Sequence, residues 1–386
     1  MIEERLRHFT NKKRATLLGV GPMSKNCIDA TIDIANRYKI PIFLIASRRQ
    51  IESEELGRGY VCGWSTEEFS KYVRKKDKHG QIVLSRDHGG PWQNPNEVAE
   101  NMSLRDAMES AKRSFQVDIE SGFDLIHIDP SIDIHSEPCL DEIVLRVFEL
   151  YEFCSEVAKK CGKKILFEIG TEEQSDSNSS LDNFEYSVNK VISYCISNGL
   201  KPPTFVVGQT GSKVAEMKNI GTFGTALRVE NEIPAEIQIP RVIEICKRNN
   251  IWLKEHNTDY LPDEVLAWHP KLSIHAANVA PEFGVAETIK FVSILKEKSF
   301  QTELDDFYKL SYNSLKWQKW VLPNTSCSME DKATLCGHYV FNRPEFKDIK
   351  ARVNSKLGSG LDLDKELRLA VERAIMRYVV NFKLLD

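Results

Sequence analysis

The sequence predicts an α/β protein, a (β/α)8 barrel (TIM barrel) that carries a helical C-terminal extension. Short apolar runs alternate with amphipathic segments of helical period, which is typical of parallel strands covered by helices. Polar residues and glycines gather at one end of nearly every apolar run. Catalytic residues at one end of the strands are typical of this barrel. An open doubly wound sheet shows the same alternation, and it remains an alternative on this evidence.

Eight apolar runs predict the strands of the barrel. They cover residues 15–20, 41–46, 81–85, 125–128, 164–169, 204–207, 251–254 and 272–274. Helices are expected between them, for example over residues 24–38, 65–75, 103–121 and 140–161. The second of these begins with Ser65 and has Glu68 three residues later, which is the pattern of a capping box.

The alternation stops after Phe283, and from residue 288 onward the pattern is helical. Trp317 and Trp320 lie on one apolar face of this part. A barrel of this type takes about 250 residues. We therefore expect the barrel in residues 1–290 and a helical extension in residues 291–386.

Composition excludes several classes of protein. The chain has 386 residues, with 52 basic against 56 acidic side chains and a net charge of −4, which does not favour nucleic acid or an anionic membrane as a partner. No run approaches the roughly 18 apolar residues that cross a bilayer. The charged N-terminus has no apolar signal core. The nine cysteines are scattered without a Cys-x-x-Cys spacing, so we expect reduced thiols in a cytoplasmic protein.

The most informative motif is Asp87-His88-Gly89-Gly90-Pro91, directly after the third apolar run. In a barrel this tip faces the mouth, where catalytic groups are found. Asp87 is then a candidate general acid/base and His88 a candidate metal ligand. Asp87 could instead cap the next helix through backbone amides.

Further candidate ligands follow other strands. Catalytic zinc sites use about three protein ligands and keep one open position. The preferred set is His88, Glu168 and His256, with Gln209 or His275 as a fourth neighbour. Histidine taken alone is more often structural, but three histidines at strand tips favour a site.

Other polar residues at strand ends are expected to act on the substrate. Glu172 is a second candidate catalytic carboxylate, after the fifth strand. Arg48 and Arg49 could clamp an anionic group, although two loop arginines are more often simply solvated. The backbone amides near Gly211 and Ser212 suit a phosphate, or form a plain turn. The remaining candidates for substrate contact are Asp129, Ser131, Asn257 and Thr258. The other histidines, including His127, are expected to be surface or packing residues.

Several motifs together resemble one family. Residues 87–91, 126–131, 169–172 and 255–260 are similar to the accessory, so-called non-catalytic, subunits of class II tagatose-bisphosphate aldolase. Residues 46–69 look like the second strand and following loop of the same family, and the similarity covers most of residues 15–290. More distantly, the frame resembles the catalytic class II fructose- and tagatose-bisphosphate aldolases.

The resemblance to the catalytic aldolases implies a divalent metal, above all Zn²⁺ with Mn²⁺ or Co²⁺ as alternatives. It implies acid/base work for Asp87 and metal binding for His88 and His256, and it puts Asn278 at a phosphate and substrate position. Gln209 stands where those aldolases have a further metal histidine, and the accessory family shares this departure.

The expected function is that of a metal-dependent aldolase (a carbon–carbon lyase) or C4-epimerase, which acts on a ketose phosphate through an enediolate. The alternative is an accessory subunit that stabilises a separate tagatose-bisphosphate aldolase and performs no chemistry. The expected partners are a small sugar phosphate, further copies of the chain and, in the accessory case, an aldolase subunit.

Overall fold

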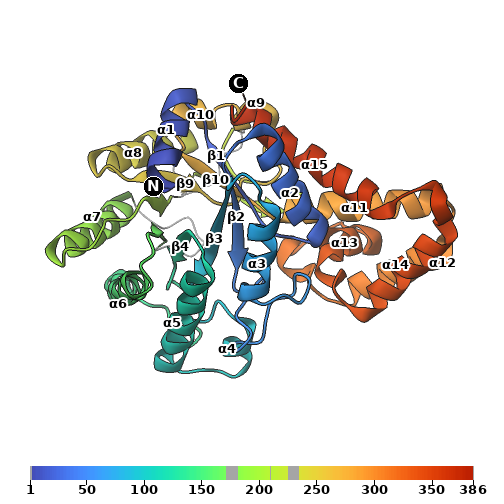
Figure 1. Cartoon of the computed structure of the whole chain (residues 1–386), viewed down its shortest axis with the longest axis horizontal. Helices are drawn as coiled ribbons and strands as arrows, with labels where there is room; N and C mark the ends of the chain where they lie inside the picture. The colour runs from blue at the N-terminus through green and yellow to red at the C-terminus, as the bar shows by residue number, and fades with distance from the viewer. Residues whose placement is uncertain (1, 171–180, 209, 225–233, 386) are drawn as a thin grey trace.

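The computed structural model describes residues 2–170, 181–208, 210–224 and 234–385. In this part of the chain eight parallel strands close into a barrel with helices outside, so the predicted (β/α)8 fold is confirmed (Figure 1). The strands follow the order β1-β10-β9-β6-β5-β4-β3-β2. Their bounds are β1 Leu17–Val20, β2 Ile42–Ser47, β3 Ile82–Gly89, β4 Leu125–Ile128, β5 Leu166–Ile169, β6 Phe205–Val207, β9 Trp252–Glu255 and β10 Ala276–Val279.

Helices follow the strands in turn, as a barrel requires. Those up to β10 are α1 Ile2–Lys13, α2 Lys25–Tyr38, α3 Thr66–Lys76, α4 Pro95–Ala99, α5 Leu104–Ser121, α6 Leu140–Lys160, α7 Leu181–Ser197, α8 Ala235–Arg248, α9 Asp263–Leu266 and α10 His269–Leu272. The predicted capping box of α3 is present, since Ser65 and Glu68 each accept a hydrogen bond from the other's backbone amide. A small antiparallel hairpin, β7 Val214–Ala215 and β8 Lys218–Asn219, follows β6.

The barrel interior is filled by inward side chains of successive strands. Phe43, Val83, Phe205 and Trp252 belong to one buried cluster, and Leu6 of α1 covers its lower end. Alternate residues on the same strands face the helices instead, as the twofold period of a strand requires. The barrel is therefore closed and packed at its N-terminal end, which leaves the C-terminal ends of the strands as the open side.

Seven of the eight predicted strands are present, and the prediction for the last is wrong. The final strand is β10, whereas residues 272–274 lie at the end of α10 and in the turn after it. Ser273 has a positive φ of 65° there, which lies outside the region of a regular strand. The short run around Leu272 and Ile274 packs into the core from this turn, so its apolar character reflects burial and not a strand.

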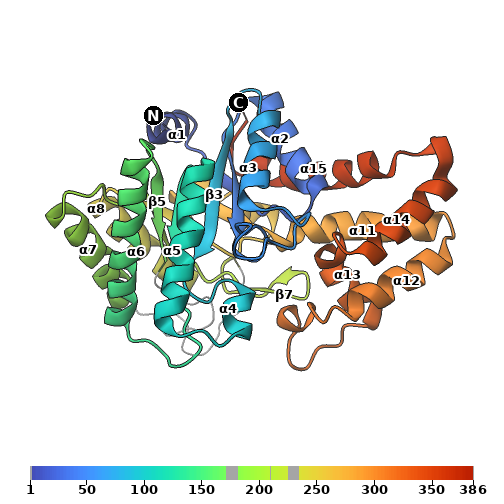
Figure 2. The same ribbon diagram turned by 60° about the horizontal axis from the view of Figure 1, so that its bottom comes forward.

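Beyond the barrel, α11 Pro281–Glu297 leads into a helical region that lies to one side (Figure 2). This region contains α12 Gln301–Tyr312, η1 Gln318–Trp320, α13 Met329–Cys336, η2 Gly337–Val340, α14 Pro344–Leu357, η3 Gly358–Gly360 and α15 Leu363–Asn381. Phe291, Phe307 and Phe346 form the centre of its own apolar cluster. The second half of α15 returns to α2 and packs into the barrel core. Among the described helices, none is both long and apolar enough to cross a membrane.

Candidate functional site

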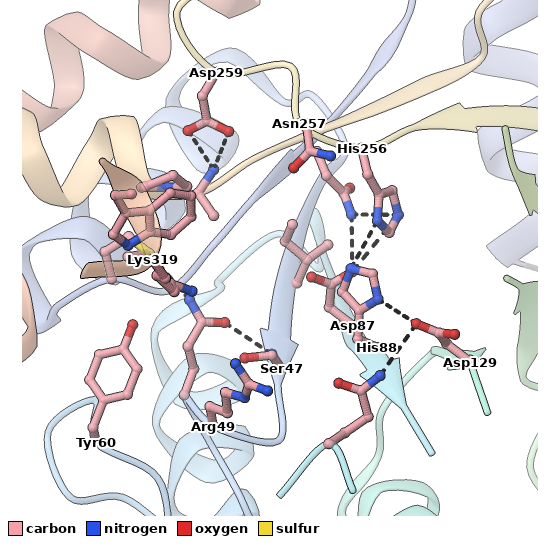
Figure 3. Close-up of a pocket in the computed structure, with 18 of the residues that line it drawn as sticks. Ser47, Arg49, Tyr60, Asp87, His88, Asp129, His256, Asn257, Asp259 and Lys319 are labelled. Atoms are coloured by element: carbon pink, nitrogen blue, oxygen red, sulfur yellow. Dashed lines mark hydrogen bonds and ion pairs between the residues drawn. The ribbon is translucent and has the colours of Figure 1, made fainter. Parts of the chain in front are cut away.

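A cavity of about 300 Å³ opens at the C-terminal ends of the strands (Figure 3). Residues after β2, β3, β4, β9 and β10 contribute to it, and so do three residues of the helical extension. The predicted residues that line it are Arg49, Asp87, His88, Asp129, Ser131, His256, Asn257 and Asn278. Eight of the predicted site residues therefore share one cavity at the mouth of the barrel.

A bulge in β3 brings Asp87 and His88 to the same cavity. Adjacent residues on a regular strand point to opposite faces. Here the register with β4 shifts between Arg86 and Gly89, and His88 has a φ of 44°. A bulge of this kind re-aims a side chain. Gly89 permits it, because a Cβ at this position would lie 2.2 Å from Cε1 of Phe115.

A carboxylate holds the outer nitrogen of His88. Nδ1 of His88 lies 2.7 Å from Oδ2 of Asp129, so it donates its proton there and leaves Nε2 as the acceptor nitrogen. The other oxygen of Asp129 accepts the hydroxyl of Ser131 at 2.6 Å. Asp129 and Ser131, which were expected to bind substrate, both line the cavity, and their contacts also orient His88.

His256 is oriented in the same way from the opposite side. Its Nε2 lies 3.0 Å from Oε1 of Glu168, and Nζ of Lys254 lies 2.6 Å from the other oxygen of that carboxylate. Burial alone would raise the pKa of Glu168, but the charge of Lys254 and the nearby imidazoles lower it to about 2. Glu168 is therefore ionised and keeps the proton of His256 on Nε2, which leaves Nδ1 as the acceptor.

The two acceptor nitrogens face each other. Nε2 of His88 and Nδ1 of His256 lie 3.1 Å apart, and such a pair needs a cation between or beside it. A proton can serve: burial lowers the pKa of His88, but Asp87 and Asp129 raise it to about 9, whereas burial lowers the pKa of His256. Two imidazoles whose outer nitrogens bind carboxylates are also the ligand arrangement of many metal sites. These residues fit a divalent metal ion.

Asp87 lies beside the two imidazoles. Burial raises its pKa, but the charges of His88, His256 and His127 outweigh burial and hold the pKa well below its usual range. Nδ2 of Asn278 donates to Oδ1 of Asp87 at 3.1 Å. Gly19 makes room for that amide, since a Cβ there would lie 2.2 Å from Oδ1 of Asn278. Asp87 is therefore an oriented, ionised carboxylate at the cavity wall.

His127 belongs to this cluster, and the prediction that it is a surface or packing residue is wrong. It sits in β4, and its Nδ1 accepts the backbone amide of His88 at 3.0 Å. The same nitrogen lies 3.8 Å from Asp87 and from Glu168. Geometry allows two ligand groups in the described residues, Asp87 with His127 and His256, and His88 with His127 and Asp129. In the sequence, the indication for His127 was its position two residues before Asp129, because residues two apart on a strand point to the same face.

Two predicted residues lie elsewhere. Arg48 is 1% exposed, and it pairs with Glu52 at 2.6 Å and with Glu97 at 2.7 Å, so it supports the fold and does not reach the cavity. His275 precedes β10 and lies at the opposite end of the barrel, where its ring stacks on Trp252 with centroids 5.2 Å apart. It therefore does not join the cluster of His88, Glu168 and His256, in which it was expected as a fourth neighbour.

The remaining predicted residues support the loops near the mouth. Ser212 donates to the backbone oxygen of His256 at 3.0 Å, and the carbonyl of Gly211 accepts the amide of Thr222 at 2.7 Å. The backbone amide of Thr258 donates to the carbonyl of Asn278. Gly211, Ser212 and Thr258 do not line the cavity. Glu172 and Gln209 lie outside the described residues.

Sequence reasoning missed the other wall of the cavity. It consists of Ser47, Gln50 and Tyr60 near β2, Asp259 after β9, and Lys319, Trp320 and Tyr339 of the extension. Burial and the neighbouring Glu282 raise the pKa of Asp259 to about 8. The tryptophans of the extension were visible in the sequence, but nothing local showed that they would reach the barrel.

Solved structures of similar fold include sugar-metabolising proteins. A probable tagatose 6 phosphate kinase from Sinorhizobium meliloti aligns with 95% of this chain and 100% of its own, at 17% identity and a TM-score of 0.70. The fructuronate-tagaturonate epimerase UxaE from Cohnella laeviribosi aligns over 96% and 81%, at 12% identity and a TM-score of 0.58. A fructose-bisphosphate aldolase from Campylobacter jejuni aligns over 100% and 94%, at 12% identity and a TM-score of 0.55. These likenesses show a shared barrel fold.

Sequence comparison adds the family. A search of curated protein sequences gives no significant match. Residues 3–176 match the family model described as D-tagatose-1,6-bisphosphate aldolase subunit GatZ/KbaZ-like. This range carries β1 to β5, with Asp87, His88 and Asp129. The resemblance predicted from the motifs is confirmed: over residues 3–176 the chain is similar to the GatZ/KbaZ-like subunits of D-tagatose-1,6-bisphosphate aldolase.

Proposed function

We propose that this protein is a metal-dependent aldolase or C4-epimerase that acts on a ketose phosphate. The observation that carries the proposal is the pair of acceptor nitrogens, Nε2 of His88 and Nδ1 of His256, 3.1 Å apart beside the ionised Asp87. Two nitrogens bound to one zinc ion at about 2.0–2.1 Å each would be separated by roughly 3.3 Å in a tetrahedral site. The spacing in the chain is close to this value.

His88 and His256 would hold the metal through these nitrogens. We infer that Glu168 orients His256 and does not itself bind the metal, because its two oxygens are occupied by His256 and Lys254. Nitrogen and carboxylate donors suit Zn²⁺, Mn²⁺ or Co²⁺. When bound, a divalent ion supplies Lewis-acid polarisation of the substrate ketone.

Asp87 would move the proton. As an ionised carboxylate it accepts the proton of the C4 hydroxyl when the bond between C3 and C4 breaks, and it returns the proton when that bond reforms. Asn278 holds the carboxylate in place through its amide. If the aldehyde fragment leaves, the outcome is cleavage. If the fragment rotates before the bond reforms, the outcome is epimerisation at C4.

Several features favour a ketose phosphate over other substrates. The cavity of about 300 Å³ is of the size that encloses a small polar ligand. Arg49, Asn257 and Asn278 place a cation and two amides on its wall. The names of the similar structures, an epimerase and an aldolase, support the two outcomes of the same bond cleavage.

A second candidate is an accessory subunit that stabilises a separate aldolase. It is favoured by the similarity of residues 3–176 to GatZ/KbaZ-like aldolase subunits, and by Gln209 in place of a metal histidine. In that case the chain would bind an aldolase polypeptide and would not turn over a sugar itself.

Metal analysis separates the two candidates. The protein, purified without a histidine tag or chelator, should contain about one divalent ion per chain. The ion should be lost from His88→Ala and His256→Ala but kept in His79→Ala, which changes an exposed histidine away from the cavity. Loaded protein is then assayed for cleavage of D-tagatose 1,6-bisphosphate and for C4 epimerisation. A stable metal-free chain without turnover that raises the activity of a separate aldolase would establish the accessory role.

A further inference from the structure

The helical extension contributes a cationic side chain to the cavity of the barrel. Lys319 of η1 lines the cavity together with Arg49, which follows β2. Figure 3 shows both on the side of the cavity opposite to the cluster of His88, His256 and Asp129. The two ends of the cavity therefore differ in chemistry: Asp87 and the imidazoles of His88 and His256 lie at one end, and two cations lie at the other. Asp259 shares the wall with Lys319, and its pKa of about 8 leaves its carboxyl group largely protonated at neutral pH.

Neither cation is neutralised within the described part of the chain. Arg49 and Lys319 are exposed at the rim of the cavity and make no ion pair with any described residue, in contrast to the buried Arg48 and Lys254. Partial desolvation at the cavity rim, together with the charges of Arg49 and Lys316, lowers the pKa of Lys319 to about 8. Two like charges that share a cavity repel each other, and an anion between them removes this repulsion.

The turn that carries Lys319 is held from two sides. The amide of Glu216, in the β7–β8 hairpin, donates to the carbonyl of Trp320 at 2.8 Å, and its carboxylate accepts the amide of Leu322 at 3.1 Å. Nε1 of Trp320 donates to the hydroxyl of Tyr339 at 3.2 Å. The β7–β8 hairpin of the barrel and Tyr339 of the extension thus hold this turn at the rim of the cavity.

Aromatic rings complete this end of the cavity. The rings of Tyr60 and Tyr339 lie 5.1 Å apart, and Nζ of Lys319 lies 4.2 Å from the centroid of Trp320. An aromatic wall with two cations suits a sugar whose terminal group is anionic, since the rings contact carbon–hydrogen faces and the cations bind the charge.

We propose that Arg49 and Lys319 bind the terminal anionic group of the substrate, so that the helical extension completes the substrate site. The inference rests on the proposed action on an anionic ketose. It adds the orientation: the anionic end lies under the extension, and the reacting carbons lie at Asp87, His88 and His256. Phosphate and carboxylate share the chemistry that this end recognises.

The first test needs neither metal nor turnover. Chelator-treated protein is labelled with an amine-acylating reagent near pH 8, and labelling of Lys319 and Lys316 is followed by peptide mass spectrometry. Millimolar inorganic phosphate should slow labelling of Lys319 by about fivefold or more. Labelling of the control, Lys316 in the same segment, should change by less than about twofold. Acetate in place of phosphate tests the carboxylate. Protection by either ion supports the site and identifies the preferred anion; protection by neither overturns it.

Variants test the same end with sugars. By calorimetry, D-tagatose 6-phosphate or D-tagaturonate should bind at least about tenfold more weakly to Lys319→Met and Arg49→Met than to the native chain, and Lys316→Met should be unchanged. Lys319→Arg should retain most of the affinity. If metal binding and turnover are present but Lys319→Met binds both sugars normally, the anion site is wrong and the proposed function stands. If phosphate protects Lys319 in a chain without turnover, the anion site stands and the proposed function is wrong.

Discussion

Oδ2 of Asp129 accepts a hydrogen bond from Nδ1 of His88 at 2.7 Å, and this contact decides which nitrogen of His88 faces the cavity. Burial raises the pKa of Asp129, but the hydrogen bond and charge of His88 lower it below its usual value. Asp129 is thus an anion whose main contact is an imidazole. A carboxylate in this position makes the opposite nitrogen of the ring a better electron donor.

Replacement of Asp129 by Asn should therefore weaken metal binding by about 10–100-fold while the chain remains folded. The measurement is competition with a chromogenic chelator, with circular dichroism as the check on folding. Ser131→Ala is the control, because it removes the donor to the other oxygen of Asp129 and leaves the contact with His88. Equal metal affinities in the native chain and in Asp129→Asn would contradict an orienting role.

Asp87→Asn should separate binding from chemistry. The amide keeps the size of the side chain but cannot take a proton, so turnover of a ketose phosphate should fall by about a hundredfold or more. Metal content should be retained if His88 and His256 are the ligands. Elemental analysis and single-turnover kinetics on one preparation make the comparison. Undiminished turnover would move the proton transfer to another group that lines the cavity, such as Asp259.

The sequence predicted the barrel well because its signal is local and repeated. Seven strands were found from apolar runs, and polar residues after them marked the mouth, where Asp87, His88 and His256 do meet. The eighth strand was missed because β10 contains Ala276, Ala277 and Asn278, whose small or polar side chains look less like a strand than the apolar turn before it.

The parts that could not be predicted depend on long-range contacts. His127 lies inside an apolar run and reads as a core residue until β3 and β5 stand beside it. Lys319 reaches the cavity only because the extension folds back onto the rim, which no local pattern encodes. Adjacent arginines are equivalent in sequence, and only the buried Glu52 and Glu97 show which of the two is structural.

Arg48 and Arg49 should consequently behave in opposite ways. Arg48→Met leaves two buried carboxylates without their cation and should lower the free energy of unfolding by about 3–5 kcal/mol. Arg49→Met removes an exposed side chain and should change the free energy of unfolding by no more than about 0.5 kcal/mol. Urea denaturation of both variants provides the measurement. Similar losses in the two would mean that Arg49 also supports the fold.

Gly89→Ala tests whether the bulge in β3 shapes the site. The new methyl group would lie 2.2 Å from Cε1 of Phe115, so strand and helix must move apart, at a cost of about 1–3 kcal/mol. The same movement should displace His88 and lower metal affinity. Gly360→Ala is the matched control, since nothing lies within 4 Å of its Cβ position. A Gly89→Ala chain with native stability and full metal content would show that the bulge tolerates the extra carbon.

His275 should make stability fall at acid pH from the far end of the barrel. Burial, with the charges of Arg7 and Lys247, lowers its pKa from the ordinary 6.5 to about 4. Between these values the unfolded chain binds more protons at this site than the native chain does. The contribution of neutral His275 is therefore complete above about pH 6.5 and is lost as the pH falls towards 4, by at most roughly 3 kcal/mol.

His275→Phe isolates this effect, because phenylalanine keeps the stacking on Trp252 and cannot be protonated. The variant loses the acceptor for the amide of Leu253, so it should be less stable than the native chain at pH 7.5. The difference should shrink or reverse at pH 5, because only the native chain then carries the unfavourable protonation. Urea denaturation at the two pH values measures the difference in the free energy of unfolding between the two chains at each pH. Parallel losses of stability in the two chains would show that His275 titrates normally, and the acid sensitivity would have to come from other buried groups such as His338, whose pKa burial lowers to about 3.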